Sequence, residues 1–89
     1  MIARFAIKKR ERAYFGVKYL LCVNRRIYFI DHENPFDSEP NYKEYKTNEE
    51  AVNKMQGYKG MYVLFEEQPE WLKAFVSITI ECYARTIKL

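Results

Sequence analysis

The stretch YFGVKYLLCV, residues 14–23, is dense in aromatic and branched apolar residues, which favour β-strands. It predicts one long strand whose more apolar side carries Phe15, Val17, Tyr19, Leu21 and Val23. A short polar turn follows at residues 24–26, and IYFI at 27–30 reads as a returning strand. The length of that turn fits a β-hairpin, so the sequence predicts an antiparallel sheet built outward from this pair.

Four further stretches predict strands around this hairpin. Residues 2–8 alternate apolar and charged side chains, as a half-buried strand does, and the charged residues 9–13 read as a connector. Residues 42–46 suit a short edge strand, and MYVLF at 61–65 suits another. The cleanest alternation of the chain runs over residues 76–84, which we expect to be the longest strand.

A helix is predicted directly after the quartet TNEE at residues 47–50. In this capping-box pattern the Thr47 hydroxyl accepts a hydrogen bond from the Glu50 backbone N–H, and the Glu50 side chain reaches back to the Thr47 N–H. Ala51, Val52 and Met55 then share one face, and Gly57 can end the helix. A helix of this length needs a sheet to pack on.

These elements predict the α+β class. We expect a single compact domain, residues 1–89, with an antiparallel sheet of four to six strands and one short helix, about residues 48–56, packed on one face. The expected order is β-β-β-(β)-α-β-β. A chain of 89 residues that is 48% hydrophobic and 30% charged can fold around one core and is not of the disordered class.

The sequence also bears on the compartment. No apolar run approaches the roughly 20 residues of a membrane span, and the N-terminal charges follow an apolar start, the reverse of an export signal. Cys22 and Cys82 are far apart and form no disulfide or metal pattern, so both are expected to be reduced core residues. We therefore expect a cytoplasmic, intracellular and reducing location, with no membrane partner.

The net charge of +3 hides two blocks of opposite sign. Residues 1–30 hold eight basic side chains against one acid, and residues 31–50 hold seven acids against two lysines. Such blocks can orient a charged partner, or they can neutralise each other across the sheet. The sequence leaves both interpretations open.

No catalytic or cofactor motif is present in the sequence. The single histidine, His32, lies in the loop DHENPFD, and the acids around it lack the spacing and the glycine of a calcium loop. We therefore expect a protein that is not an enzyme, with no metal and no cofactor.

Two sets of residues are candidates for binding a partner. In the first, positive charge is interleaved with aromatic rings, a combination that suits protein contacts or unpaired bases; its members are Lys8, Lys9, Arg10, Arg12, Tyr14, Arg25 and Arg26. The alternative set combines acids with tyrosines, which are common at interfaces; its members are Asp31, Glu33, Asp37, Tyr42 and Tyr45.

Together these features predict a non-enzymatic protein-binding module, an inhibitor or an adaptor. In size and style, with its eight tyrosines and its split charge, the chain resembles the accessory proteins of phages and mobile elements that block host defences, anti-CRISPR proteins included. That resemblance implies another protein or a ribonucleoprotein as partner. The alternative function is binding of single-stranded nucleic acid, RNA or DNA, through the basic aromatic N-terminal hairpin. The chain is expected to be a monomer or a homodimer.

Overall fold

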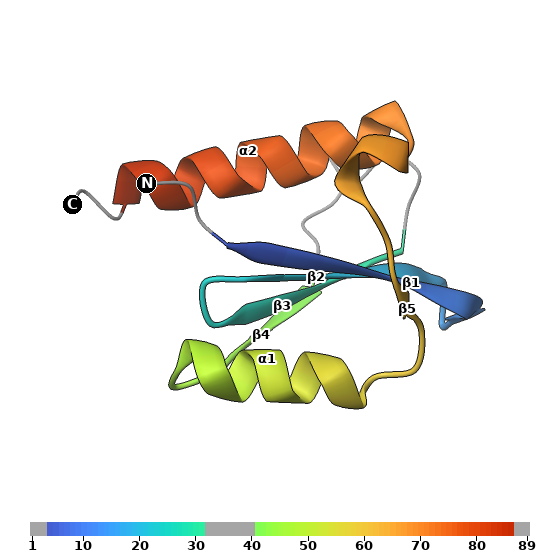
Figure 1. Cartoon of the computed structure of the whole chain (residues 1–89), viewed down its shortest axis with the longest axis horizontal. Helices are drawn as coiled ribbons and strands as arrows, with labels where there is room; N and C mark the ends of the chain where they lie inside the picture. The colour runs from blue at the N-terminus through green and yellow to red at the C-terminus, as the bar shows by residue number, and fades with distance from the viewer. Residues whose placement is uncertain (1–3, 32–40, 87–89) are drawn as a thin grey trace.

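In a computed structural model, the described residues 4–31 and 41–86 form one antiparallel sheet with a helix on each face (Figure 1). The elements in chain order are β1 Phe5–Tyr14, β2 Val17–Val23, β3 Arg26–Ile30, β4 Asn41–Glu44, α1 Asn48–Gly57, β5 Met61–Tyr62, the 3₁₀ turn η2 Phe65–Glu67, and α2 Glu70–Thr86. The strand order is β4-β3-β2-β1-β5. The predicted α+β class is confirmed, whereas the expected single helix is wrong, because two helices are present.

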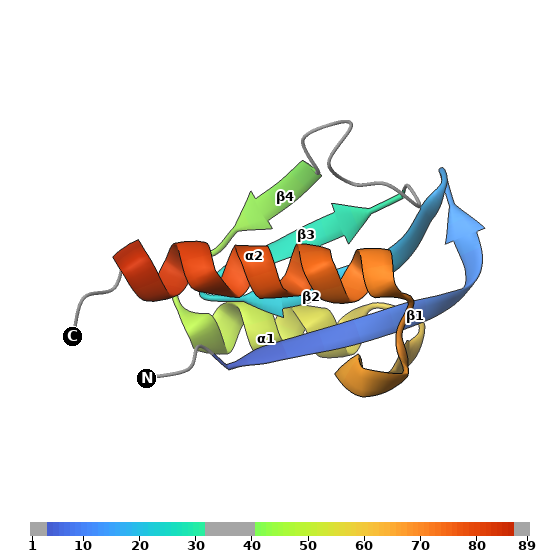
Figure 2. The same cartoon turned by 90° about the horizontal axis from the view of Figure 1, so that it is seen from above.

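The central strand β2 is covered on both faces, which explains its unbroken apolar run. Leu20 and Cys22 face α1, where they pack with Ile27, Ala51 and Met55. Residues on the other face pack against α2; this second core contains Ile7, Tyr19, Leu21, Val23, Tyr28, Ile30, Leu72, Phe75 and Val76. Figure 2 shows α2 lying along the sheet on this side. Burial of Cys22 was expected and is confirmed.

The start of the sheet differs from the prediction in one respect. Residues 14–23 are not one strand, because the chain turns at Phe15 and Gly16, and the expected connector at residues 9–13 belongs to β1. Tyr14 pairs with Val17, so the turn is a two-residue hairpin loop. Both loop residues have positive φ, 51° and 82°, as the mirror-image hairpin turns require. Only Gly16 gives a sequence signal for such a turn.

The strand expected at residues 76–84 is instead part of α2. Leu72, Phe75 and Val76 are buried at the i, i+3, i+4 spacing of a helix, with exposed fractions of 0%, 6% and 0%. Ile78, which the alternation placed in the core, is 49% exposed, and Cys82 is exposed rather than a core residue. Packing of the helical face therefore outweighs the strand propensity of the branched residues.

Neither helix among the described residues combines the length and apolar character needed to cross a bilayer. The strand expected at 61–65 is shorter than predicted: only Met61–Tyr62 pairs with β1, and the chain turns into η2 at Phe65.

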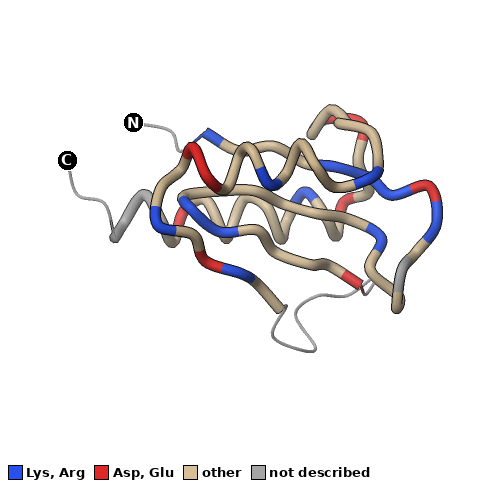
Figure 3. Tube along the Cα trace, turned by 90° about the horizontal axis from the view of Figure 1, so that it is seen from below, with Lys and Arg blue, Asp and Glu red and all other residues tan. Residues whose placement is uncertain are grey.

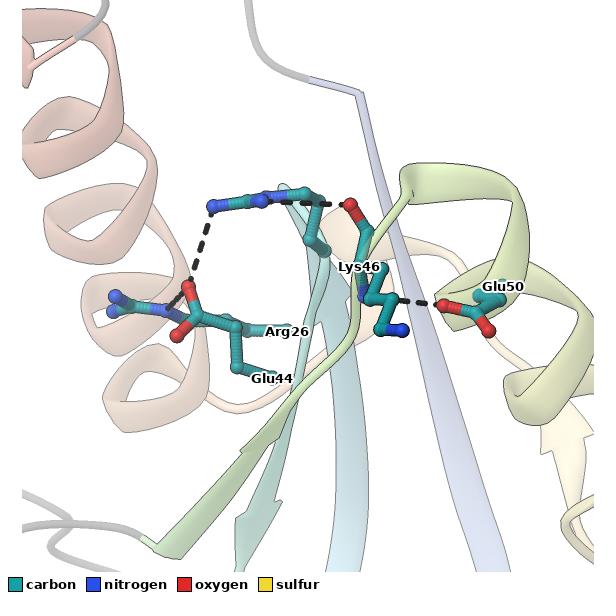
Figure 4. A network of polar contacts seen from close by, with 5 residues as sticks. Arg26, Glu44, Lys46 and Glu50 are labelled. Carbon is teal, nitrogen blue, oxygen red and sulfur yellow. Dashed lines mark hydrogen bonds and ion pairs between the residues drawn. The ribbon is translucent and has the colours of Figure 1, made fainter.

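Helix α1 begins where the capping pattern predicted. The Thr47 Oγ1 accepts from the Glu50 backbone N–H at 3.1 Å. The Glu50 carboxylate accepts from the backbone N–H of Lys46 at 3.1 Å rather than from that of Thr47, so the reach-back bond is displaced by one residue (Figure 4). The first bond satisfies a donor of the first turn that the helix leaves unpaired, and the second satisfies the donor of the residue that precedes the N-cap.

Thr47→Ala is expected to lower the free energy of unfolding by about 1 kcal/mol, because the Glu50 N–H loses its acceptor. Chemical denaturation should show a lower midpoint at unchanged slope. Asn53→Ala, on the exposed part of the same helix, is the matched control and should change stability little. An unchanged midpoint for Thr47→Ala would contradict the assigned N-cap.

Candidate protein-binding surface

An aromatic ring occupies the outermost turn of the β1–β2 hairpin. Phe15 is 87% exposed, and its backbone lies in the left-handed region at φ 51°. Asparagine, aspartate or glycine normally fills this position, because other residues are strained there by about 1–2 kcal/mol. The chain therefore places a large apolar side chain in water at a site where a polar residue would be more stable. An exposed apolar side chain on a strained backbone makes Phe15 a candidate contact residue.

The strand that carries Phe15 bows outward just before the turn. Lys9 pairs with Tyr19 and Tyr14 pairs with Val17, so residues 10–13 of β1 oppose only Lys18. The three extra residues form a large bulge, visible as the outward curve of β1 in Figure 2. Bulges of this kind disrupt ladder pairing and are frequent beside functional sites.

Charge is concentrated on this bulge. We call residues 9–18 the hairpin tip; Lys9, Arg12 and Lys18 are exposed on it, and Arg10 is half-buried. Figure 3 shows the basic and acidic positions of the bulge on the arc at one end of the molecule. Glu11 lies within the arc, and Asp31 lies beside the turn, its Cβ 3.6 Å from where a Gly16 Cβ would be. The surface is therefore basic with acidic members rather than uniformly positive.

Lys8, a member of the predicted basic set, is not on this surface. Its side chain is only 4% exposed and points to the α1 side of the sheet. The Lys8 Nζ donates to the backbone carbonyls of Met55 at 3.0 Å, Gln56 at 3.3 Å and Tyr58 at 2.6 Å. These carbonyls lie at the C-terminal end of α1, where a helix favours positive charge. Lys8 therefore caps a helix, and its ammonium group is not available to a partner.

Arg25 and Arg26 lie at the opposite end of the sheet from the hairpin tip, because Phe5, at the start of β1, pairs with Val23. The Glu44 carboxylate accepts from Arg25 at 3.5 Å and from Arg26 at 3.2 Å (Figure 4). One acid of the acidic block, Glu44, is thus paired with two arginines of the basic block at this end. The predicted basic set is therefore divided among three places: the end of α1, the hairpin tip and the Arg25–Arg26 end of the sheet.

The alternative, acidic set is only partly within the described residues. Glu33 and Asp37 lie outside them, as does His32, and so does the side chain of Tyr14 from the first set. Tyr42 is half-exposed on the edge strand β4, with the Arg26 guanidinium 4.7 Å from its ring centre. Its ring therefore already has a cationic neighbour within the chain.

Tyr45, of the same alternative set, turns toward the α1 core. Its hydroxyl is buried, with no hydrogen-bond partner among the described residues, and burial together with nearby Tyr58 raises its pKa. Burial also raises the pKa of the Cys22 thiol, which keeps it protonated at neutral pH. Within residues 4–31 and 41–86, His, Cys, Asp and Glu side chains nowhere gather in threes as a metal site would require.

Of the hairpin tip, the predicted basic set contains Lys9, Arg10, Arg12 and Tyr14 but not Phe15 or Lys18. The available signal was the dipeptide Phe15-Gly16 between two strand-like stretches. It was missed because residues 14–23 were predicted as one long strand, with no turn in it. Comparison of the chain with protein-family models, with curated proteins and with solved structures gave no match.

Proposed function

We propose that this domain is a non-enzymatic protein-binding module, an inhibitor or adaptor, that uses the hairpin tip as its contact surface. The observation that carries the proposal is the strained and exposed Phe15 at the outermost turn. Aromatic anchors that enter an apolar pocket supply much of the energy of protein interfaces. The exposed bases Lys9 and Arg12 would steer the tip toward an acidic rim around that pocket.

Two features favour a protein over a nucleic acid as the partner. Single-stranded nucleic acids are held by a continuous basic groove and several aromatic platforms on which successive bases stack. Among the tip side chains that the structure describes, one aromatic ring, that of Phe15, is strongly exposed, and two acids, Glu11 and Asp31, stand among the bases. A single anchor with mixed charge around it resembles an interface hot spot with its polar rim.

Phe15→Asn tests the proposal without harming the fold. Asparagine suits the left-handed turn position, so the variant is expected to unfold at the same temperature as the wild type or at a higher one. The affinity of the immobilised domain for the protein it captures from a lysate is expected to fall at least tenfold, which corresponds to about 1.4 kcal/mol of binding free energy. Val52→Asn, at an exposed apolar position on α1, should leave capture unchanged.

The same capture experiment, repeated after nuclease treatment, separates the two partner classes. Capture that survives nuclease and is lost in Phe15→Asn supports the protein partner. Capture that disappears with nuclease, with a steep dependence on salt concentration, would support the nucleic-acid alternative. Equal capture by the wild type and Phe15→Asn would show that the hairpin tip is not the contact surface.

A further inference from the structure

The outer side of β4 is an unpaired edge of the sheet. On its inner side β4 pairs with β3, and in the same register the Tyr45 N–H donates to the Arg25 carbonyl at 2.7 Å. Because hydrogen-bonded pairs alternate along an antiparallel ladder, the backbone N–H and C=O groups of Tyr42 and Glu44 point away from β3. Among the described strands only β3 lies beside β4, so these groups are available to an added strand.

The other edge of the sheet, at β5, is less available. β5 consists of Met61–Tyr62 alone, and the 3₁₀ turn η2 follows closely. Between them, the Leu64 carbonyl already accepts from the Gln68 Nε2 at 2.9 Å and from the Glu67 N–H at 3.3 Å. β4, with all four of its residues exposed, is therefore open to pairing over a longer stretch.

Apolar side chains are exposed on the α2 side of the β4 edge. The centre of the Tyr28 ring, on β3, lies 5.4 Å from that of the Tyr42 ring and 6.2 Å from that of the Phe75 ring on α2. Ile78 comes three residues after Phe75 and lies on the same side of the helix. Tyr28 and Phe75 are buried, whereas Tyr42 and Ile78 are each half-exposed. Figure 2 shows β4 beside α2 rather than beneath it, so an apolar side chain on that side of an added strand would pack beside the Tyr42 ring.

A basic side chain lies on the α1 side of the same edge. Lys43 is exposed there, because side chains alternate along a strand and its neighbours Tyr42 and Glu44 lie on the α2 side. The charge of Glu44 is compensated by Arg25 and Arg26, so it does not oppose an acidic segment. An acidic residue directly opposite Lys43 would form a favourable cross-strand pair.

We propose that the outer edge of β4 binds an extended segment of another protein, which adds to the five-stranded sheet as a further strand. The backbone groups of Tyr42 and Glu44 bind the segment, an apolar side chain packs beside Tyr42, and an acidic side chain lies opposite Lys43. In strand addition of this kind, main-chain hydrogen bonds supply affinity and alternate side chains supply specificity. This binding does not depend on the function proposed for the hairpin tip.

A second copy of the chain does not supply the acid. Two-fold pairing of β4 with itself, centred on any of residues 42–44, places Asn41, Lys43 or Tyr45 opposite Lys43. The partner is therefore expected to be a different protein, with a segment in which apolar and acidic residues alternate.

The probe is a synthetic peptide of alternating valine and glutamate, which in an extended strand presents valines on one side and acids on the other. It is titrated into the isotope-labelled full chain and followed by two-dimensional NMR. The largest amide shifts are expected on β4, and hydrogen exchange of the Tyr42 and Glu44 N–H groups should slow as they become paired. A peptide of alternating valine and lysine is the matched control and should bind at least about tenfold more weakly.

A charge reversal tests the contact at Lys43. Lys43→Glu is expected to exchange the preference, so that this variant binds the valine–lysine peptide more tightly than the valine–glutamate peptide. Lys54→Glu makes the same change of charge at an exposed position of α1 and should keep the wild-type preference. An unchanged preference in Lys43→Glu would overturn the proposed pairing.

Backbone pairing is tested at Tyr42 by two variants that both lose the ring. Tyr42→Thr keeps the outward N–H, whereas Tyr42→Pro removes it, and proline is tolerated on an edge strand where its nitrogen faces away from the ladder. Tyr42→Pro is expected to bind the valine–glutamate peptide at least about tenfold more weakly than Tyr42→Thr does. Should the proline variant be unfolded, the wild type with a peptide N-methylated at alternate residues makes the same test.

The proposal is overturned if millimolar valine–glutamate peptide leaves the β4 amides unshifted, if the wild type binds both peptides equally, or if removal of the outward N–H changes nothing. Shifts on β4 that grow with the concentration of the chain alone would assign the edge to a second copy instead. Phe15→Asn should bind the peptide as the wild type does, which separates this result from failure of the proposed function.

Discussion

Val76→Asp is expected to unfold the domain, whereas Ile78→Asp, two residues further on, is expected to leave it folded. Val76 is completely buried between α2 and the sheet, while Ile78 is 49% exposed on the outer side of the helix. An unpaired carboxylate in the core costs several kcal/mol, a large part of the 5–15 kcal/mol that stabilises a typical domain. Thermal melting followed by circular dichroism measures both effects.

This pair of variants distinguishes the helix from the strand that the sequence pattern predicted. In a strand, Val76, Ile78 and Ile80 would share one buried side, and Asp at either of the first two positions would be equally damaging. Equal losses of melting temperature at Val76 and Ile78 would therefore contradict α2 as described. Ser77→Asp, on the exposed side of the helix, serves as the control and should melt as the wild type does.

The failure to predict α2 has a specific physical cause. The residues that anchor the helix, Leu72 and Phe75, come before the alternating run, just after a stretch around Pro69 whose sequence suits either a turn or a single helical turn extending to Phe75. The alternation of apolar and polar residues after Val76 lies on the part of α2 that is less buried against the sheet. Its two-residue period therefore does not reflect which side chains are buried. Helix α1 was predicted because its start depends on bonds within four residues of sequence, at Thr47 and Glu50.

The positions of the charged residues were predicted only in part, for a related reason. Sequence spacing showed that basic residues cluster before and after β2, and it placed Lys9, Arg10 and Arg12 together. It could not show that Glu44 pairs with Arg25 and Arg26, because that contact depends on the position of β4 beside β3. Nor could it show that α1 covers the face of β1 that carries Lys8. Alternation of apolar and charged residues along a strand indicates which side chains share a face. It does not show that a helix covers each of the two faces.

Lys8→Met is expected to lower the free energy of unfolding by about 3 kcal/mol. Methionine keeps most of the apolar stem that the core surrounds, but it removes a charged donor from three backbone carbonyls at the end of α1. Hydrogen bonds to charged groups contribute about 1.5–3 kcal/mol each, and the gain from burying a neutral side chain offsets part of their sum. Chemical denaturation provides the measurement.

Lys9→Met is the matched control for this effect, since it makes the same chemical change one residue along the same strand. Lys9 is exposed, and its replacement should alter stability by no more than about 0.5 kcal/mol. Equal stability of the two variants would mean that the Lys8 ammonium group does not hold the end of α1. The two lysines thus have opposite roles: Lys8 joins helix α1 to the sheet, and Lys9, facing solvent beside the bulge, belongs to the surface that we propose meets the partner. Lys9→Met should accordingly slow partner association without affecting the fold, and the folded fraction of Lys8→Met should bind as the wild type does.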